Sequence, residues 1–319
     1  MKIYKPNIFL RNAHFNTLYP VLFRWQKDPA YLRKRFITAD DDFIDIDYRL
    51  GDNRRLAVIL HGLEGSSYSK YIIGTGELLS QNSWDVAAFN HRSCSGEINL
   101  KKTMYHSGWT TDLSYYIDSI KDSYEEIVLV GFSLGGNMAL KYAGEKSTDI
   151  DERIKAVIGI SVPTDLKGGS ETIGKTSNWI YEKKFMVTLK EKMKQKAEHY
   201  PENFDIRKLN KLNRLYDFDD LYTGPIHGFR DANDYYEQCS SKKFIADIRV
   251  NALLINALDD PFLSESCFPF EICEKNDKVE FIAPKHGGHV GFASMRDRFY
   301  WNEYMILDFA NRHSNLSSF

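Results

Sequence analysis

Residues 125–145 read EEIVLVGFSLGGNMALKYAGE, and this stretch decides the fold class. The apolar run from Ile127 to Val130 is typical of a strand that is buried on both faces. A glycine-rich turn follows, and the residues after it have the composition of a helix. A buried strand that turns directly into a helix is the basic unit of an α/β fold.

The same alternation of short apolar runs and helical segments continues along the chain. Further strands are predicted at 42–50, 56–60, 84–90, 154–163, 251–257 and 278–284. Helices are predicted to end at about Leu79, to span 109–124 and to span 298–311. We therefore expect an α/β fold with a mostly parallel central sheet flanked by helices. In 42–50, apolar and polar residues alternate, which predicts a half-buried strand.

Residues 165–245 interrupt this alternation. The segment is rich in lysine and contains no convincing run for a buried strand. Because strands are predicted on either side of it, we expect a helical cap inserted into a single domain that spans residues 1–319. Its lysines are interpreted as a solvated helix face rather than as a membrane-binding patch.

Composition excludes several classes of protein. The net charge of −2 gives no indication of nucleic acid as a partner. The four cysteines include no C-x-x-C pair, so neither a disulfide framework nor a zinc site is expected. The first 20 residues lack the continuous apolar region of a signal peptide, and no run of about 18 apolar residues predicts a transmembrane helix. A cytoplasmic location is expected, while peripheral membrane contact and oligomeric state stay open.

The turn at 131–135 has the sequence Gly-Phe-Ser-Leu-Gly, which fits the pattern G-x-S-x-G. In this pattern the serine lies on a strained strand-to-helix turn, and the glycines prevent a clash with neighbouring backbone. The helix N-terminus then directs N–H groups at the site, where they favour negative charge. Ser133 is therefore the predicted nucleophile. A turn that serves only to pack the helix on the strand is the alternative.

A nucleophilic serine needs a histidine base and an acid that orients it, and here both are expected later in the chain. Asp259 and Asp260 directly follow a predicted strand, and His286 and His289 follow the last one. We favour Asp260 because in this kind of fold the acid is commonly followed by two residues and then an aliphatic one, as it is here. We favour His289 because the two glycines before it give its loop conformational freedom.

Acyl chemistry also needs donors for the oxyanion of the tetrahedral intermediate. One is expected to be the backbone N–H of Leu134, directly after the nucleophile. The other is expected from the loop after an early strand, at the backbone N–H of Leu63. His61 in that loop is interpreted as a structural residue.

Several longer motifs occur in a fixed order: RNAHFNTLYP, HGLEGSSYSKYI, NHRSCSGEINLKKTMYHSG, VGFSLGGNMALKY, FDDLYTGPIHGF with DANDYYEQCS, ALDDPF and HGGHVGF. Together they resemble the YheT-like family of α/β-hydrolases, which is related to the abhydrolase-domain proteins 1, 2 and 3. The resemblance spans nearly the whole chain. One departure is Ser93, where the family usually has glycine.

The resemblance implies hydrolysis of carboxylic esters, with Ser133 as nucleophile, His289 as base and either Asp259 or Asp260 as acid. It also implies that the cap packs over the site. Cys94, next to the departure from the family pattern, is interpreted as a small loop residue near the pocket.

The predicted function is therefore cleavage of a small-molecule carboxylic ester, of a lipid or of a short or medium acyl chain, through an acyl-enzyme intermediate. Neither a metal nor an organic cofactor is required. An acyltransferase that uses the same triad is one alternative. A non-catalytic binding module on a hydrolase fold is the other.

Overall fold

The computed structural model describes residues 3–315, in which eight strands form one sheet in the order β1-β2-β4-β3-β5-β6-β7-β8. β2 pairs antiparallel with both β1 and β4, and every other pairing is parallel. The predicted fold class is therefore confirmed. The strands are β1 (Leu32–Ile37), β2 (Phe43–Arg49), β3 (Arg55–Leu60), β4 (Asp85–Asn90), β5 (Glu126–Phe132), β6 (Ile154–Ile160), β7 (Asn251–Ile255) and β8 (Val279–Ile282).

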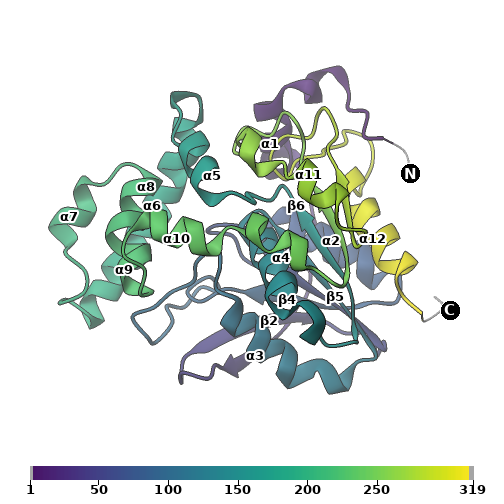
Figure 1. Cartoon of the computed structure of the whole chain (residues 1–319), viewed down its shortest axis with the longest axis horizontal. Helices are drawn as coiled ribbons and strands as arrows, with labels where there is room; N and C mark the ends of the chain where they lie inside the picture. The colour runs from purple at the N-terminus through teal and green to yellow at the C-terminus, as the bar shows by residue number, and fades with distance from the viewer. Residues whose placement is uncertain (1–2, 316–319) are drawn as a thin grey trace.

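Helices cover both faces of this sheet (Figure 1). Successive side chains of a strand point to opposite faces. Leu129 of β5 thus belongs to the apolar cluster beneath α3 and α4, whereas Val130 belongs to the cluster beneath α2 and α12. Burial on both faces explains why the central strands are uniformly apolar. The helices are α2 (Lys70–Ser80), α3 (Thr110–Ile120), α4 (Leu134–Lys146) and α12 (Trp301–Arg312).

The prediction of a half-buried strand at 42–50 is wrong, because all of β2 up to Tyr48 is buried. Its polar face carries Asp45 and Asp47, which pair with Arg35 and Arg33 of β1 at 2.8 and 2.7 Å. β1 itself is an edge strand without an apolar run, and sequence reasoning missed it. The aspartates are buried because a neighbouring strand supplies their counter-charges.

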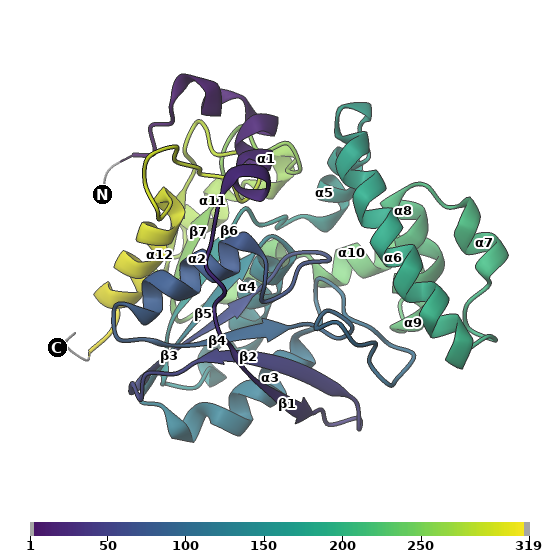
Figure 2. The ribbon, with the colours of Figure 1, turned by 180° about the vertical axis from the view of Figure 1, so that it is seen from behind.

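Sequence reasoning also missed the N-terminal helices, η1 (Ile8–Arg11) and α1 (Ala13–Phe23). The side chain of Asn12 caps α1 by accepting a hydrogen bond from Phe15 N–H. Figure 2 shows this segment beside the loop that precedes α12. Asn16 connects α1 to this loop, because its side-chain oxygen accepts a hydrogen bond from Ala293 N–H.

The chain between β6 and β7 is helical and contains no strand among its described residues. These helices form a lobe beyond one end of the sheet (Figures 1 and 2) and have an apolar cluster of their own around Met186, Leu189, Met193 and Phe218. They are α5 (Leu166–Ile173), α6 (Trp179–His199), α7 (Ile206–Lys211), α8 (Leu215–Phe218), a π-helical turn (Asp219–Thr223), α9 (Gly224–Ile226) and α10 (Ala232–Cys239).

Two lysines of α6 correct the interpretation of its basic residues as a solvated face. The Lys196 side chain is fully buried and donates hydrogen bonds to the backbone oxygens of Asn99 and Lys101. The ammonium group of Lys192 lies 2.8 Å from the Glu64 carboxylate. These two lysines attach α6 to loops at the end of the sheet, so the helical lobe is held in place by polar contacts as well as by apolar packing.

Candidate active site

Ser133 lies at the junction of β5 and α4 with φ = 52° and ψ = −119°, a strained conformation for a residue with a side chain. The glycines around it are required by close backbone approach. A Cβ atom on Gly131 would lie 2.2 Å from the backbone oxygen of Gly135, and one on Gly135 would lie 2.5 Å from that of Leu60. The turn therefore packs directly against the end of β3 and holds the serine above the sheet.

His289 bridges Ser133 and Asp260. Its Nε2 lies 3.0 Å from Ser133 Oγ, and its Nδ1 lies 2.9 Å from Asp260 Oδ2. Burial raises the pKa of the Asp260 carboxyl above its usual value, and the neighbouring His289 lowers it in part. The structure thus brings together the three side chains that the sequence singled out, from the loops after β5, β7 and β8.

The two adjacent aspartates bind different histidines. Asp259 lies 3.1 Å from His286 Nδ1 and accepts a hydrogen bond of 3.0 Å from Gly288 N–H. Because Gly288 directly precedes His289, the Asp259–His286 pair braces the loop that carries the histidine beside Ser133. The geometry therefore assigns the two aspartates different contacts, which the order of motifs alone left open.

The backbone N–H groups of Leu63 and Leu134 belong to residues that line the same cavity as Ser133. Among the described residues, neither N–H donates a hydrogen bond. A Cβ atom on Gly62 would lie 3.1 Å from the Cβ of Ser133, so the loop that carries Leu63 touches the nucleophile. Two residues of this cavity wall therefore have a backbone N–H without a hydrogen-bond partner among the described residues.

His61 has a structural role in that loop. Its Nδ1 lies 2.7 Å from the backbone oxygen of Gly62, and its Nε2 accepts a hydrogen bond from His91 N–H. Burial lowers the pKa of His61 well below its usual value, so the ring is neutral. The ring fixes the path of the backbone beside Ser133.

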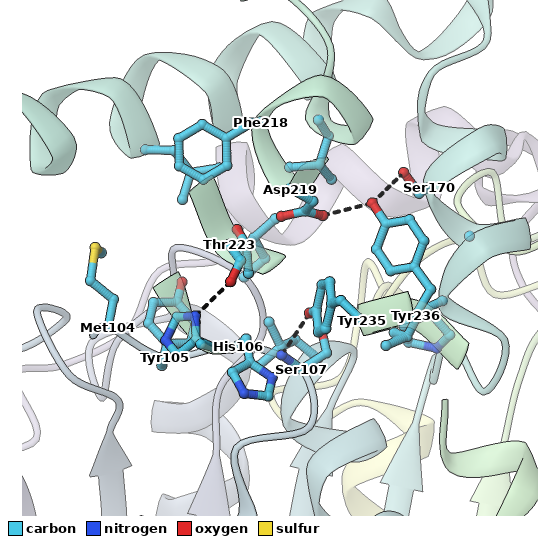
Figure 3. A pocket seen from close by; sticks show the side chains of 18 of the residues that line it. Met104, Tyr105, His106, Ser107, Ser170, Phe218, Asp219, Thr223, Tyr235 and Tyr236 are labelled. Carbon is cyan, nitrogen blue, oxygen red and sulfur yellow. Dashed lines mark hydrogen bonds between the residues drawn. The ribbon is translucent and has the colours of Figure 1, made fainter. Parts of the chain in front are cut away.

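Figure 3 shows the cavity that opens beside the serine, between the sheet and the helical lobe. Its empty volume is about 860 Å³, including its open mouth. Most of the wall is apolar, and its members include Leu63, Leu166, Ile173, Leu189, Met193, Phe218 and Ile226. A predominantly apolar wall with a few polar groups is typical of a small-molecule site.

Sequence reasoning missed Asp219, a polar residue in this wall. The Tyr236 hydroxyl lies 2.7 Å from Asp219 Oδ2 and 3.0 Å from Ser170 Oγ (Figure 3). Burial raises the pKa of Asp219 to about 6, although hydrogen bonds from Thr223 and Tyr236 lower it. Asp219 begins the π-helical turn, a feature that often occurs at functional sites. No local pattern distinguishes it from the aspartates around it.

Cys94 and His227 each contact a neighbouring group of the protein. Cys94 is buried with Lys192 Nζ 3.2 Å from its sulfur, and burial raises the pKa of its thiol to about 11. His227 lines the cavity with its Nδ1 2.7 Å from the backbone oxygen of Thr223. Across residues 3–315, no three histidine, cysteine, aspartate or glutamate side chains gather as a metal ion requires.

A serine on a strained strand-to-helix turn, beside a histidine and a buried aspartate from later loops, is the arrangement of α/β-hydrolases. Residues 58–294 match the family model described as the alpha/beta hydrolase fold. The chain belongs to this family.

Proteins of similar sequence carry the names of an esterase, a lipase and a phospholipase. An Escherichia coli (strain K12) protein named YheT, which carries a provisional assignment as an esterase, is 33% identical to this chain. The alignment covers 88% of this chain and 84% of YheT. This chain is 28% identical, over 84% of its length, to 61% of a monoacylglycerol lipase of Saccharomyces cerevisiae. A phospholipase of Bos taurus is 26% identical over 86% of this chain and 73% of its own length. The resemblance to YheT-like proteins and the predicted class of enzyme, a carboxylic-ester hydrolase, are confirmed.

Solved structures support the fold. An esterase of Pyrococcus furiosus superposes with a TM-score of 0.59 at 15% identity and covers 91% of this chain and 97% of its own. The mouse alpha/beta hydrolase domain-containing protein 10 superposes with a TM-score of 0.58 at 14% identity and covers 89% of this chain and 100% of its own.

Within residues 3–315, no helix combines the length and the apolar character needed to cross a membrane.

Proposed function

We propose that this protein is a serine esterase that forms an acyl-enzyme intermediate on Ser133. The single observation that carries the proposal is the chain of contacts Ser133–His289–Asp260, at 3.0 and 2.9 Å. In this mechanism His289 Nε2 removes the proton from Ser133 Oγ as the oxygen attacks the ester carbonyl. The same proton then passes to the departing alcohol, and water hydrolyses the acyl-enzyme by the reverse sequence.

Asp260 has two roles in the proposed reaction. Its hydrogen bond to Nδ1 keeps the proton on that nitrogen, so that Nε2 is free to act as the base. Its buried carboxylate also stabilises the imidazolium that forms in each step. Burial raises the pKa of Asp260 because its charge lacks solvation. A positive charge appearing on His289 relieves that cost, so the aspartate favours proton transfer to the histidine.

The backbone N–H groups of Leu63 and Leu134 are the proposed donors to the oxyanion. Both residues line the cavity at Ser133, and both N–H groups lack a partner among the described residues. An amide without a partner in the protein gives up no internal hydrogen bond when negative charge develops on the carbonyl oxygen. The N-terminus of α4 adds a favourable partial charge at the same place.

The helical segment 165–245 is proposed to act as the cap that binds the acyl group. It supplies much of the apolar wall of the cavity, from Leu166 to Ile226, and this wall faces the cavity that contains Ser133. An apolar wall favours an aliphatic acyl chain over a polar one. Since two relatives carry the names monoacylglycerol lipase and phospholipase, lipid esters are the proposed substrates.

The proposal is tested by labelling the purified protein with a fluorophosphonate, which reacts only with an activated serine. We expect Ser133→Ala to abolish labelling and the hydrolysis of a nitrophenyl ester. Ser170→Ala is the matched control, because Ser170 lines the same cavity but contacts Tyr236 rather than a histidine. Undiminished labelling of Ser133→Ala would refute the proposal. Product analysis with added alcohols then separates hydrolysis from acyl transfer.

A further inference from the structure

The N-terminal segment exposes an unusual number of large apolar side chains. Only Asn16 and Pro20 of α1 are buried, so its contact with the rest of the protein is a narrow stripe. Residues that follow each other in a helix are about 100° apart, and Val21, Leu22 and Phe23 therefore project in three directions from its last turn. The apolar side chains of residues 3–27 that are 56–81% exposed are Ile3, Ile8, Phe9, Val21, Leu22, Phe23 and Trp25.

This exposed surface carries positive charge and no negative charge of its own. Residues 3–27 contain no aspartate or glutamate, although the whole chain has 44 acidic residues against 42 basic ones. Lys5, Arg11 and Lys27 are exposed within it, whereas Arg24 is buried against Glu303. The surface therefore combines apolar and aromatic side chains with cations, as in segments that lie on an anionic bilayer.

The same segment lies directly on the loop that carries the candidate histidine. Thr17 accepts a hydrogen bond from His289 N–H at 2.9 Å, and a Cβ atom on Gly288 would lie 2.6 Å from the backbone oxygen of Ala13. His14 stacks on Tyr181 at the start of α6, where Trp179 and Ile180 are also more than half exposed. The start of α1 thus contacts the helical lobe beside two further exposed apolar side chains.

We propose that residues 3–27, which include η1 and α1, form a docking surface for a bilayer that contains anionic lipid. The apolar side chains enter the interface between headgroups and acyl chains, and Lys5, Arg11 and Lys27 contact lipid phosphates. A second copy of this chain fits the surface less well. In a two-fold dimer the same patch faces itself, and three cations on each copy would then meet a segment, residues 3–27, that contains no acidic residue. Docking is independent of the proposed chemistry at Ser133.

The experiment is flotation of the full chain with vesicles of phosphatidylglycerol mixed with phosphatidylcholine, compared with vesicles of phosphatidylcholine alone. We expect binding to the anionic vesicles that weakens as salt is added. Leu22→Ser and Trp25→Ser should each reduce it about tenfold or more, the factor that burial of one such side chain is worth. Leu100→Ser is the matched control, since Leu100 is 59% exposed and lies outside this segment.

Three outcomes overturn the proposal. One is failure of the wild-type chain to float with either kind of vesicle. Another is loss of binding in Leu100→Ser that equals the loss in Leu22→Ser. The third is a wild-type dimer in analytical ultracentrifugation that Leu22→Ser converts to a monomer, which would make a second copy the occupant. Ser133→Ala should float like the wild type, and Leu22→Ser should still hydrolyse a water-soluble ester, so failure of docking and failure of the esterase proposal are distinguishable.

Discussion

The hydroxyl oxygen of Thr17 accepts a hydrogen bond of 2.9 Å from the backbone N–H of His289, which is 272 positions later in the chain. The same hydroxyl donates to the backbone oxygen of Ala13 one turn earlier in α1. The N-terminal helix therefore holds the backbone of the candidate base. The N-terminal part of the chain thus positions a residue of the candidate site that lies in its C-terminal part.

Replacing Thr17 with valine keeps the shape of the side chain but leaves the His289 N–H without an acceptor. We expect kcat for a soluble ester to fall about fivefold to tenfold, the effect of roughly 1–1.4 kcal/mol from one lost hydrogen bond. Thr17→Ser should restore most of the rate because the hydroxyl is retained. Steady-state kinetics of the two variants provide the test, and equal rates for valine and serine would show that the hydrogen bond is unimportant.

The two aspartates after β7 should differ sharply on replacement. Asp260→Asn removes the charge beside His289 Nδ1 and allows the wrong tautomer, so kcat should fall by a factor on the order of 10³–10⁴. Asp259→Asn keeps an oxygen that can accept from Gly288 N–H and changes only the contact to His286, so a loss below about tenfold is expected. The comparison is made from kcat of both variants at saturating ester. A larger loss in Asp259→Asn would reverse the proposed roles.

Gly135→Ala should destabilise the fold. The added Cβ would lie 2.5 Å from the backbone oxygen of Leu60, and backbone atoms of two packed elements cannot move apart cheaply. We expect the free energy of unfolding to fall by about 3 kcal/mol or more. Gly76→Ala is the control, because its Cβ would meet the Val86 side chain at 3.2 Å and alanine favours helix α2. Urea denaturation of both variants should separate them.

Asp219 should make stability depend on pH. Its folded pKa is raised from 3.8 to about 6 by burial, so between these values the folded state binds more protons than the unfolded state. Stability from this group is therefore complete below pH about 4 and is lost as pH rises through about 6. Relative to Asp219→Asn, the wild type should lose free energy of unfolding over this range. Urea denaturation at several pH values measures the difference, and parallel curves for the two proteins would contradict it.

Much of the fold was predictable because its evidence is local. Apolar runs indicate strands buried on both faces and alternation indicates half-buried ones, and together these patterns predict seven of the eight strands in residues 3–315. Gly131, Ser133 and Gly135 predict the strained turn because only glycine fits between the end of β5, the start of α4 and β3. The candidates Asp260 and His289 could also be chosen from strand order, since loops after neighbouring parallel strands meet at one edge of a sheet.

Other features depend on partners that no local pattern identifies. The prediction that 42–50 is half-buried is wrong because Arg33 and Arg35, from an edge strand without an apolar signature, neutralise the aspartates of β2. Spacing along α6 does not distinguish Lys192 and Lys196, which contact other segments, from the exposed lysines of the helix. The contacts of Lys192 and Lys196 depend on loops 95 to 128 residues earlier that offer carbonyl oxygens and a carboxylate.

Periodicity and backbone sterics act between near neighbours, so the sequence alone predicted every strand of residues 3–315 except β1, together with the nucleophile turn and the residue types of the candidate site. Only the tertiary structure decided which aspartate meets which histidine, where Asp219 lies and that α1 supports the histidine loop. Those relationships are contacts between distant segments, and the free energy of a buried polar group depends on the partner that the fold brings to it.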